Sequence, residues 1–252
     1  MPAPHPTTDT PPESLRTPRL IALGAILVVL ALLYAAFAAR AQPAQLLPAP
    51  TGPSVAAPQG ATRASVVLAG GCFWGVQAVF QHTRGVLNAV SGYTGGAPDH
   101  ANYPAVSSGS TSHAEAVQVT YDPQQITLGE ILQVFFSVAH NPTERNRQGP
   151  DMGPQYRSAV FYTDDAQRNL ARAYIAQLDA AAVLGAPIAT EVVPLTAFYR
   201  AESGHQDYAT NNPYALYIAT YDAPKLRNLQ TLLPQRYRDV PVLTDAVGAP
   251  SA

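Results

Sequence analysis

The chain has a single cysteine, Cys72, among its 252 residues. One cysteine cannot form an intrachain disulfide, and it cannot supply a cysteine-based zinc cluster or a C-x-x-C redox motif.

Charge is also scarce, because charged residues make up 13% of the chain and the formal net charge is −2. A chain without a basic patch has no electrostatic footprint for nucleic acid, so we expect no nucleic-acid partner.

Residues that bind metals are present but do not follow a metal-binding spacing. The sequence has no H-E-x-x-H pattern, in which two histidines one helical turn apart hold zinc. We therefore expect no metal and no bound cofactor, although four residues offer ligand atoms: His113, Glu115, His205 and Asp207.

Cys72 stands in the turn Gly70-Gly71-Cys72-Phe73-Trp74-Gly75. The apolar run 65–68 predicts a strand before it, and apolar residues at helical spacing over 76–80 predict a helix after it. Free N–H groups and the positive end of the dipole at a helix N-terminus lower the pKa of a thiol. We therefore interpret Cys72 as a nucleophile. The alternative is an ordinary buried side chain, which is what most free cysteines are.

Strand and helix patterns alternate along the rest of the chain. Thr127 and Glu130 form a capping box at the start of one helix, and Pro224 suits the first turn of another. Long glycine- and proline-bearing loops, 92–112 and 141–155, interrupt the pattern. Strands are predicted at 65–68, 115–121, 158–162 and, as the last, 190–195; helices are predicted after Cys72, after Thr127, from Thr163 to about Ala182, and over 225–233. This order predicts an α+β domain of two layers.

Glu115 shares one face of the predicted strand 115–121 with Val117 and Val119. If those valines face the core, the carboxylate does too, and burial raises its pKa so that it can serve as a general acid. Alternatively, Glu115 lies at the exposed end of the strand beside His113 and is solvated.

The segment 20–39 contains no charged residue and is long enough, at roughly 30 Å as a helix, to cross a bilayer. We favour an uncleaved anchor over a signal peptide, although Ala39-Arg40-Ala41 resembles a cleavage site. Arg16 and Arg19 precede the segment, which predicts a cytoplasmic N-terminus and a domain outside the inner membrane of a bacterium. The alternative is release into the periplasm after cleavage.

The chain thus divides into five predicted parts. They are a disordered segment at 1–15, the anchor or signal at 16–40, an Ala/Pro-rich linker at 41–63, a catalytic domain at 64–242 and a disordered tail at 243–252.

Five motifs, in this order and spacing, resemble the A-class peptide methionine sulfoxide reductases. They are Gly71-Cys72-Phe73-Trp74-Gly75, Ser91-Gly92-Tyr93-Thr94-Gly95-Gly96, the segment 109–117 with His113-Ala114-Glu115, the segment 146–158 with Asp151 and Tyr156, and His205-Gln206-Asp207-Tyr208. The resemblance runs from about Ala64 to about Arg238. It implies a mixed sheet with packed helices and a ferredoxin-like core, preceded here by the hydrophobic helix.

The resemblance also implies roles for individual residues. Cys72 would attack the sulfur of a methionine S-sulfoxide and become a sulfenic acid, while Glu115 protonates the sulfoxide oxygen. Tyr103, Tyr156 and Asp151 would complete the polar side of the pocket. Phe73 and Trp74 would hold the methyl group of the substrate, with Tyr208 nearby. The activity implied is repair of oxidised proteins or reduction of free methionine sulfoxide under oxidative stress.

The chain departs from the family in its tail. Many members carry a resolving cysteine there, whereas residues 216–252 contain none. An external thiol must then regenerate Cys72, either a thioredoxin-like protein or a small thiol, and we expect the enzyme to be a monomer. Two other functions remain open: a membrane-tethered binding module without catalysis, and an acyl-transfer hydrolase that pairs Cys72 with His113 or His205.

Overall fold

The computed structural model describes residues 26, 28, 44–52 and 60–244. The predicted segments 1–15 and 16–40, most of the linker and the end of the tail lie outside the described residues. Within the described part, no helix has the length and apolar content that a membrane crossing needs. The chain divides into two units, and the account below concerns the second, Ala44–Ala252.

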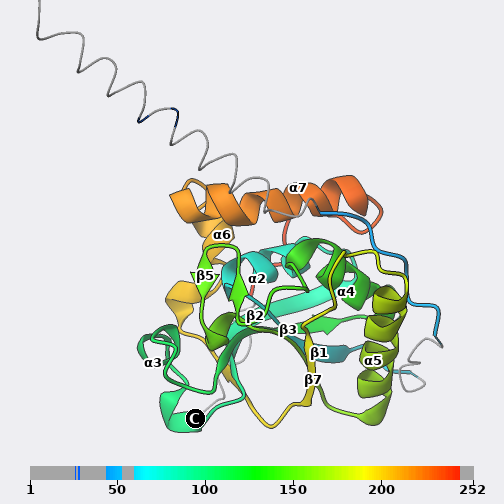
Figure 1. Cartoon of the computed structure of the whole chain (residues 1–252), viewed down its shortest axis with the longest axis horizontal. Helices are drawn as coiled ribbons and strands as arrows, with labels where there is room; N and C mark the ends of the chain where they lie inside the picture. The colour runs from blue at the N-terminus through cyan, green and yellow to red at the C-terminus, as the bar shows by residue number, and fades with distance from the viewer. Residues whose placement is uncertain (1–25, 27, 29–43, 53–59, 245–252) are drawn as a thin grey trace, which may run out of the picture. The chain divides into compact units, whose positions relative to one another are not determined.

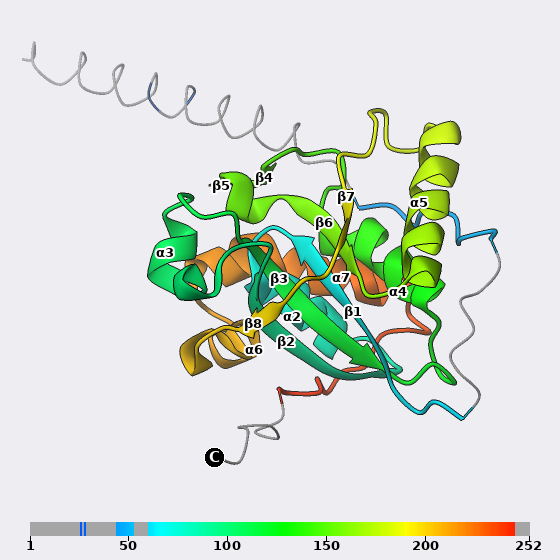
Figure 2. The ribbon, with the colours of Figure 1, turned by 90° about the horizontal axis from the view of Figure 1, so that it is seen from below.

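A six-stranded mixed sheet forms the centre of this unit, in the order β7-β6-β1-β3-β2-β8. Its neighbours are antiparallel except for the parallel pair β6 and β7 (Figure 2). The strands are β1 (Ala64–Gly70), β2 (Val86–Thr94), β3 (Ala114–Tyr121), β6 (Ser158–Tyr162), β7 (Glu191–Pro194) and β8 (Phe198–Arg200). The inner order β6-β1-β3-β2, with helices after β1 and β3, is the ferredoxin-like β-α-β-β-α-β arrangement. The expected α+β fold is confirmed.

Helices pack on this sheet, with α5 beside the β6–β7 edge (Figure 1). They are α2 (Phe73–Gln81), α3 (Tyr103–Ser107), α4 (Leu128–Val134), α5 (Asp165–Ala180), α6 (Tyr208–Asn211) and α7 (Ala223–Leu232). The chain adds π-helical turns at Phe135–Ala139 and Ile218–Asp222 and a small hairpin of β4 (Arg147–Gln148) and β5 (Asp151–Met152). The predicted capping box of Thr127 and Glu130 is present at the start of α4.

The two faces of the sheet bury different side chains. On the helix-covered face, Val117 and Val119 pack with Leu68, Val76 and Phe80 in the main core. A smaller cluster lies on the other face of the sheet. Residues from β7, β8 and the turn between them cover this cluster, whose members are Val67, Ala69, Ala114, Ala116, Ala159 and Phe161. Alternation along β1 and β3 thus separates the two cores, as period-two patterning predicts.

Two strands depart from the sequence prediction. The strand at 190–195 is not the last, because β8 follows it and pairs with β2. The strand β2 was not predicted, and the expected loop 92–112 begins inside it. Seven of its nine residues are buried, so its sequence lacks the polar and apolar alternation that marks a half-exposed strand.

The ordered domain extends beyond 64–242 at both ends. Residues 44–52, inside the predicted linker, contact α4 and α5: Leu47 is 1% exposed, and the Tyr174 hydroxyl donates to the Pro48 carbonyl at 2.7 Å. At the other end, Thr244 Oγ1 donates to Asp207 Oδ1 at 2.7 Å. Burial and these hydrogen bonds offset the entropy cost of ordering such terminal segments.

Candidate active site

Cys72 occupies the N-cap position of α2, directly after β1. Gly71 precedes it with φ +88°, and a Cβ there would lie 2.5 Å from Cβ of Gln148. Only glycine therefore fits this turn. The turn leaves the Cys72 side chain 8% exposed, so the sulfur lies at the edge of the core.

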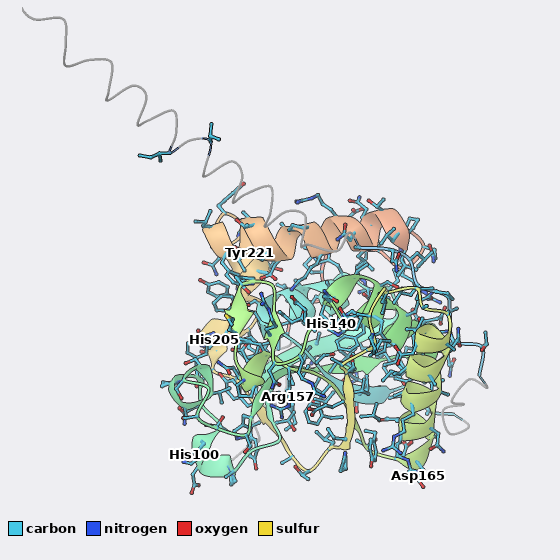
Figure 3. All side chains as sticks on the ribbon, viewed as in Figure 1. His100, His140, Arg157, Asp165, His205 and Tyr221 are labelled. Carbon is cyan, nitrogen blue, oxygen red and sulfur yellow. The ribbon has the colours of Figure 1, made fainter. Side chains whose placement is uncertain are left out.

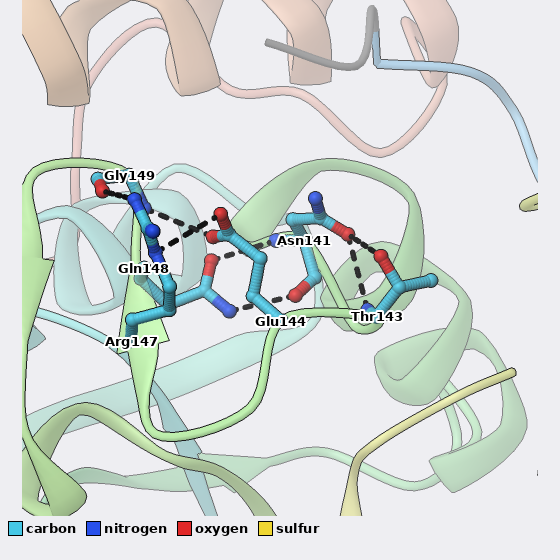
Figure 4. A network of polar contacts seen from close by, with 6 residues as sticks. All are labelled: Asn141, Thr143, Glu144, Arg147, Gln148 and Gly149. Atoms are coloured by element: carbon cyan, nitrogen blue, oxygen red, sulfur yellow. Dashed lines mark hydrogen bonds and ion pairs between the residues drawn. The ribbon is translucent and has the colours of Figure 1, made fainter. Parts of the chain in front are cut away.

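The loop that supports Gly71 is held by its own polar contacts (Figure 4). Gln148 accepts from the Asn141 N–H at 2.9 Å and donates to the Asn141 carbonyl at 2.6 Å. Glu144 accepts from the Gly149 N–H at 2.9 Å, and Arg147 donates to the Gly149 carbonyl at 2.7 Å. These bonds fix the wall against which the cysteine turn packs.

Glu115 is 2% exposed, on the same face of β3 as Val117 and Val119. The burial predicted from alternation is confirmed. Its Oε2 accepts the Phe73 N–H at 3.0 Å, at the first turn of α2 and next to Cys72. Burial raises the pKa of Glu115 to about 8, although the Phe73 hydrogen bond opposes this. Near neutral pH this carboxyl holds a proton that it can donate.

The expectation of a lowered pKa for Cys72 is wrong. Burial raises the pKa of the thiol well above its usual value, and the charges of Glu115 and Asp222 raise it further. The Trp74 N–H at the helix N-terminus does lower it, as does Lys225, but more weakly. Desolvation thus outweighs the helix N-terminus at this site.

Three of the predicted polar residues come from short elements outside the six-stranded sheet. Tyr103 opens α3, Asp151 lies in β5, and Tyr156 ends the 3₁₀ turn Pro154–Tyr156. Burial and then the charge of Glu115 raise the pKa values of both tyrosines. Burial also raises the pKa of Asp151, although Tyr217 donates a short hydrogen bond to it that opposes this shift. The fold therefore gathers all three around Cys72 and Glu115.

Aromatic rings gather beside these polar groups. Trp74 stacks on Tyr208 with centroids 3.9 Å apart, and its indole N–H donates to His205 Nδ1 at 3.3 Å. His205 also lies 4.2 Å, centroid to centroid, from Tyr103. Phe73 is fully buried against Tyr93 and His205. Trp74, Tyr103 and Tyr208 are partly exposed and can contact a ligand.

The motif His205-Gln206-Asp207-Tyr208 positions two of these rings. Gln206 is 7% exposed and bonds both backbone groups of Ser91 in β2, at 3.0 and 2.9 Å. Asp207 has φ +55° and donates its N–H to Gln77 of α2 at 2.9 Å. Anchored to β2 and α2, the segment presents His205 and Tyr208 to the indole.

The histidines do not form a cysteine–histidine pair in the described residues. His113 is buried with Nε2 bonded to the Ala97 carbonyl at 2.8 Å, and His205 accepts from Trp74. His140, which Figure 3 labels apart from His205, bonds the Ser158 hydroxyl at 2.7 Å, and burial lowers its pKa to about 3. Within the part of the chain that the structure describes, no three His, Cys, Asp or Glu side chains are grouped to hold a metal ion.

Sequence reasoning missed four residues of the site. Glu202 accepts from the Tyr93 hydroxyl and the Tyr103 N–H, at 2.8 and 2.9 Å, and Tyr217 donates to Asp151. Asp222 and Lys225 act on the thiol. The π-helical turn Ile218–Asp222 runs directly into α7, so Asp222 and Lys225 form an ordinary pair three residues apart that the sequence does not mark as part of the site. Glu202 stands in a loop, and Tyr217 directly precedes the π-helical turn Ile218–Asp222; neither has a local sequence pattern that singles it out.

Comparisons with known proteins agree with this geometry. The family model described as "Peptide methionine sulfoxide reductase" matches residues 64–236. A "Peptide methionine sulfoxide reductase MsrA 2" of Mesorhizobium japonicum is 55% identical over 179 residues, 71% of this chain and 92% of that protein. An MsrA of Natronomonas pharaonis is 46% identical over 69% of this chain and 97% of its own length.

Two solved structures share the fold. Reduced Mxr1 from Saccharomyces cerevisiae is 35% identical with a TM-score of 0.56, covering 62% of this chain and 89% of that one. Methionine sulfoxide reductase A of Corynebacterium diphtheriae is 34% identical with a TM-score of 0.53, covering 69% and 87%. The chain belongs to the peptide methionine sulfoxide reductase family, as an oxidoreductase of the peptide-methionine (S)-S-oxide reductase class.

Proposed function

We propose that Cys72 reduces methionine S-sulfoxide through a sulfenic acid, with Glu115 as the proton donor. The observation that carries the proposal is the pairing at the first turn of α2, where a nearly buried thiol stands beside a carboxyl with a pKa of about 8. A sulfoxide sulfur becomes electrophilic when its oxygen is protonated. Tyr103 and Tyr156 share the surroundings of Glu115 and assist by hydrogen bonding to that oxygen.

The reaction moves one oxygen atom from the substrate to Cys72 and then to water. The Cys72 sulfur attacks the sulfoxide sulfur while Glu115 gives its proton to the oxygen; the S–O bond of the sulfoxide then breaks, and the thiol proton of Cys72 passes to the Glu115 carboxylate. Methionine leaves with its sulfur reduced, and Cys72 retains the oxygen as a sulfenic acid. A thiol then condenses with the sulfenic acid to a mixed disulfide and releases water, and a second thiol returns Cys72 to its reduced form.

The aromatic side of the site suits the methyl group of the substrate. Trp74 and Tyr208 stack on each other and both remain partly exposed, and Phe73 is fully buried beside them. The reductant is external, since the sequence holds no second cysteine. A thioredoxin-like protein or a small thiol can reduce the Cys72 sulfenic acid. The substrates are oxidised proteins or free methionine sulfoxide. We place the domain outside the bacterial inner membrane, tethered through 20–39 or released after cleavage, on the apolar run and on Arg16 and Arg19 before it.

A single-turnover experiment tests the proposal. Full-length protein mixed with excess methionine S-sulfoxide and no reductant should release about one methionine per Cys72 and stop. A dimedone-type reagent should then label Cys72, and added thiol should restart turnover. Reaction with the R epimer is the matched control and should be slight. Many turnovers without thiol, or no label after the first equivalent, would contradict the mechanism.

A further inference from the structure

The C-terminal strap, residues 237–244, runs along the far end of helix α2, at the red end of the ribbon in Figure 2. The Arg238 N–H donates to the His82 carbonyl at 2.9 Å, and the Val242 N–H donates to the Gln81 carbonyl at 3.0 Å. Carbonyls at the end of a helix have no partner within that helix. The strap therefore supplies hydrogen bonds that α2 lacks at this end.

Thr244, the last residue of the strap, contacts Asp207. Its hydroxyl and its N–H both donate to Asp207 Oδ1, at 2.7 and 2.9 Å. Gln81 donates to the same oxygen at 2.5 Å, and Gln77 donates to the Thr244 hydroxyl at 3.0 Å. Gln77 and Gln81 are both 1% exposed. The contact thus belongs to a buried polar network, in which the loss of one partner costs free energy.

The backbone of Asp207 explains why this contact matters. Asp207 has φ +55°, in the left-handed region that residues other than glycine seldom adopt. It occupies the N-cap position of α6, yet among the described residues its side chain makes no capping hydrogen bond, which is the usual reason for an aspartate there. The carboxylate accepts from Thr244 and Gln81 instead. The hydrogen bonds to the strap and α2 therefore hold Asp207 in this conformation.

Asp207 leads directly to the aromatic rings of the site. Tyr208 follows it in the chain and stacks on Trp74 with ring centroids 3.9 Å apart. His205, two residues before Asp207, lies against the other part of the indole at 5.9 Å, centroid to centroid. Trp74 stands in the first turn of α2. The strap thus links the far end of α2 to the segment that holds two rings against its near end.

We infer that the C-terminal strap is a positioning element of the reductase site, in which Thr244 holds Asp207 and thereby fixes the stack of Tyr208 on Trp74. The inference rests on the proposed role of these two rings in holding the methyl group of the substrate. Aromatic contacts depend on the relative placement of the rings, so a displaced Tyr208 weakens substrate binding. Thr244 acts through Asp207, and the inference predicts no direct effect on Cys72.

Substitutions of Thr244 in the full-length protein test the inference. Thr244→Val keeps the branched shape and the backbone N–H but removes the hydroxyl that donates to Asp207. Thr244→Ser keeps that hydroxyl and is the conservative variant. Thr231→Val makes the same change at an exposed position of α7 and is the matched control. Circular dichroism confirms folding of each variant.

The first measurement is tryptophan fluorescence, which needs no turnover. Trp74 is the only tryptophan, so its emission reports on the ring stack alone. We expect Thr244→Val to shift the emission to longer wavelength and to increase quenching by acrylamide, because a displaced Tyr208 uncovers one face of the indole. Thr244→Ser and Thr231→Val should match the wild type. Wild-type emission and quenching in Thr244→Val overturn the inference, whatever the substrate of the enzyme.

The second measurement is steady-state reduction of methionine S-sulfoxide. Thr244→Val should raise KM about three- to tenfold and leave kcat within about twofold, as expected when part of one hydrogen bond is lost from substrate binding. The rate of Cys72 alkylation should stay at the wild-type value. A residue that only stabilises the fold would lower the melting temperature and leave KM and emission unchanged, and that result overturns the inference.

The remaining outcomes are also decisive. A shifted emission with an unchanged KM overturns the inference, and so does a fall in kcat together with altered alkylation of Cys72. If Thr244→Val does not fold, Asp207→Asn decides by the same two measurements, because it keeps an oxygen acceptor but removes the charge from the hydrogen bonds. Failure of the proposed function would appear separately, as wild-type KM in Trp74→Ala or as activity retained in Cys72→Ser.

Discussion

The two sides of the active site are held in place by different parts of the chain. Cys72 and Glu115 stand on the sheet and its first helix, fixed by backbone geometry and by the Phe73 N–H. Tyr103 and Asp151 form the loop side: they stand in short elements, α3 and β5, between long loops. The Tyr103 N–H donates to Glu202, and the Tyr217 hydroxyl donates to Asp151. In the proposed reaction, the sheet side carries the groups that change bonds, and the loop side carries groups that tune them.

The largest effect should come from the sulfur. Cys72→Ser should reduce turnover to background, because a serine hydroxyl is not ionised near neutral pH and has no sulfenic acid chemistry. Steady-state reduction of methionine S-sulfoxide with a small thiol measures it. The substitution replaces only the sulfur atom by oxygen and keeps the backbone turn, so the melting temperature should stay close to that of the wild type. Turnover near the wild-type rate would contradict the assignment.

Glu115→Gln should lower kcat by roughly 10²–10⁴, the usual contribution of a general acid. The glutamine still accepts from Phe73 but has no proton to transfer. In the wild type, activity should fall as pH rises through about 8, where Glu115 loses its proton. That alkaline limb should be missing in the variant. An unchanged rate would assign proton donation to a tyrosine of the loop side.

The same carboxyl makes stability depend on pH. Its pKa is raised from 4.5 to about 8 in the folded protein, so the folded state binds more protons than the unfolded state between those values. Stability should therefore decline as pH rises through that window. Glu115→Gln should remove part of the decline, which denaturant unfolding at several pH values would show. An identical pH dependence in both proteins would mean that Glu115 is not the group responsible.

The sequence predicted the sheet side better than the loop side, for physical reasons. Alternation with Val117 and Val119 placed Glu115 in the core because a strand's period is local. The capping box at Thr127 is local as well. Tyr103 and Asp151 lie in loops without a period, and only the family resemblance pointed to them. The partners that hold them, Glu202 and Tyr217, lie far along the chain, and only the folded structure reveals such contacts.

Cys72 shows where local reasoning reaches its limit even on the sheet side. Its position at a helix start was predicted, but the direction of its pKa shift was not. The sign depends on burial and on Glu115 and Asp222, which come from other elements. Electrostatics at a buried site sums over all neighbours, whereas a sequence motif shows only the adjacent ones.

Trp74 joins the two sides, since it stands in α2 and stacks on Tyr208 of α6. Trp74→Ala should raise KM about tenfold, as expected for the loss of aromatic contact of about 1.5 kcal/mol. The rate of Cys72 alkylation should change much less. Measuring both in one variant separates binding from thiol reactivity. Equal losses would show that the indole positions the sulfur instead of the substrate.

The smallest effect should come from the hydrogen bond that holds Asp151. Tyr217→Phe removes the hydroxyl that donates to this carboxylate and keeps the ring that packs on Trp74. That bond lowers the pKa of Asp151 against the effect of burial, so its loss should raise the pKa and move the acid limb of the kcat/KM profile to higher pH. At neutral pH, kcat/KM should fall about two- to fivefold, the worth of one modest hydrogen bond. Tyr221→Phe on the same segment is the matched control, because the hydroxyl that donates to Asp151 belongs to Tyr217, whereas the Tyr221 ring only packs on Tyr217. A drop in kcat/KM with an unmoved acid limb would mean that Tyr217 positions the loop and does not tune the charge of Asp151.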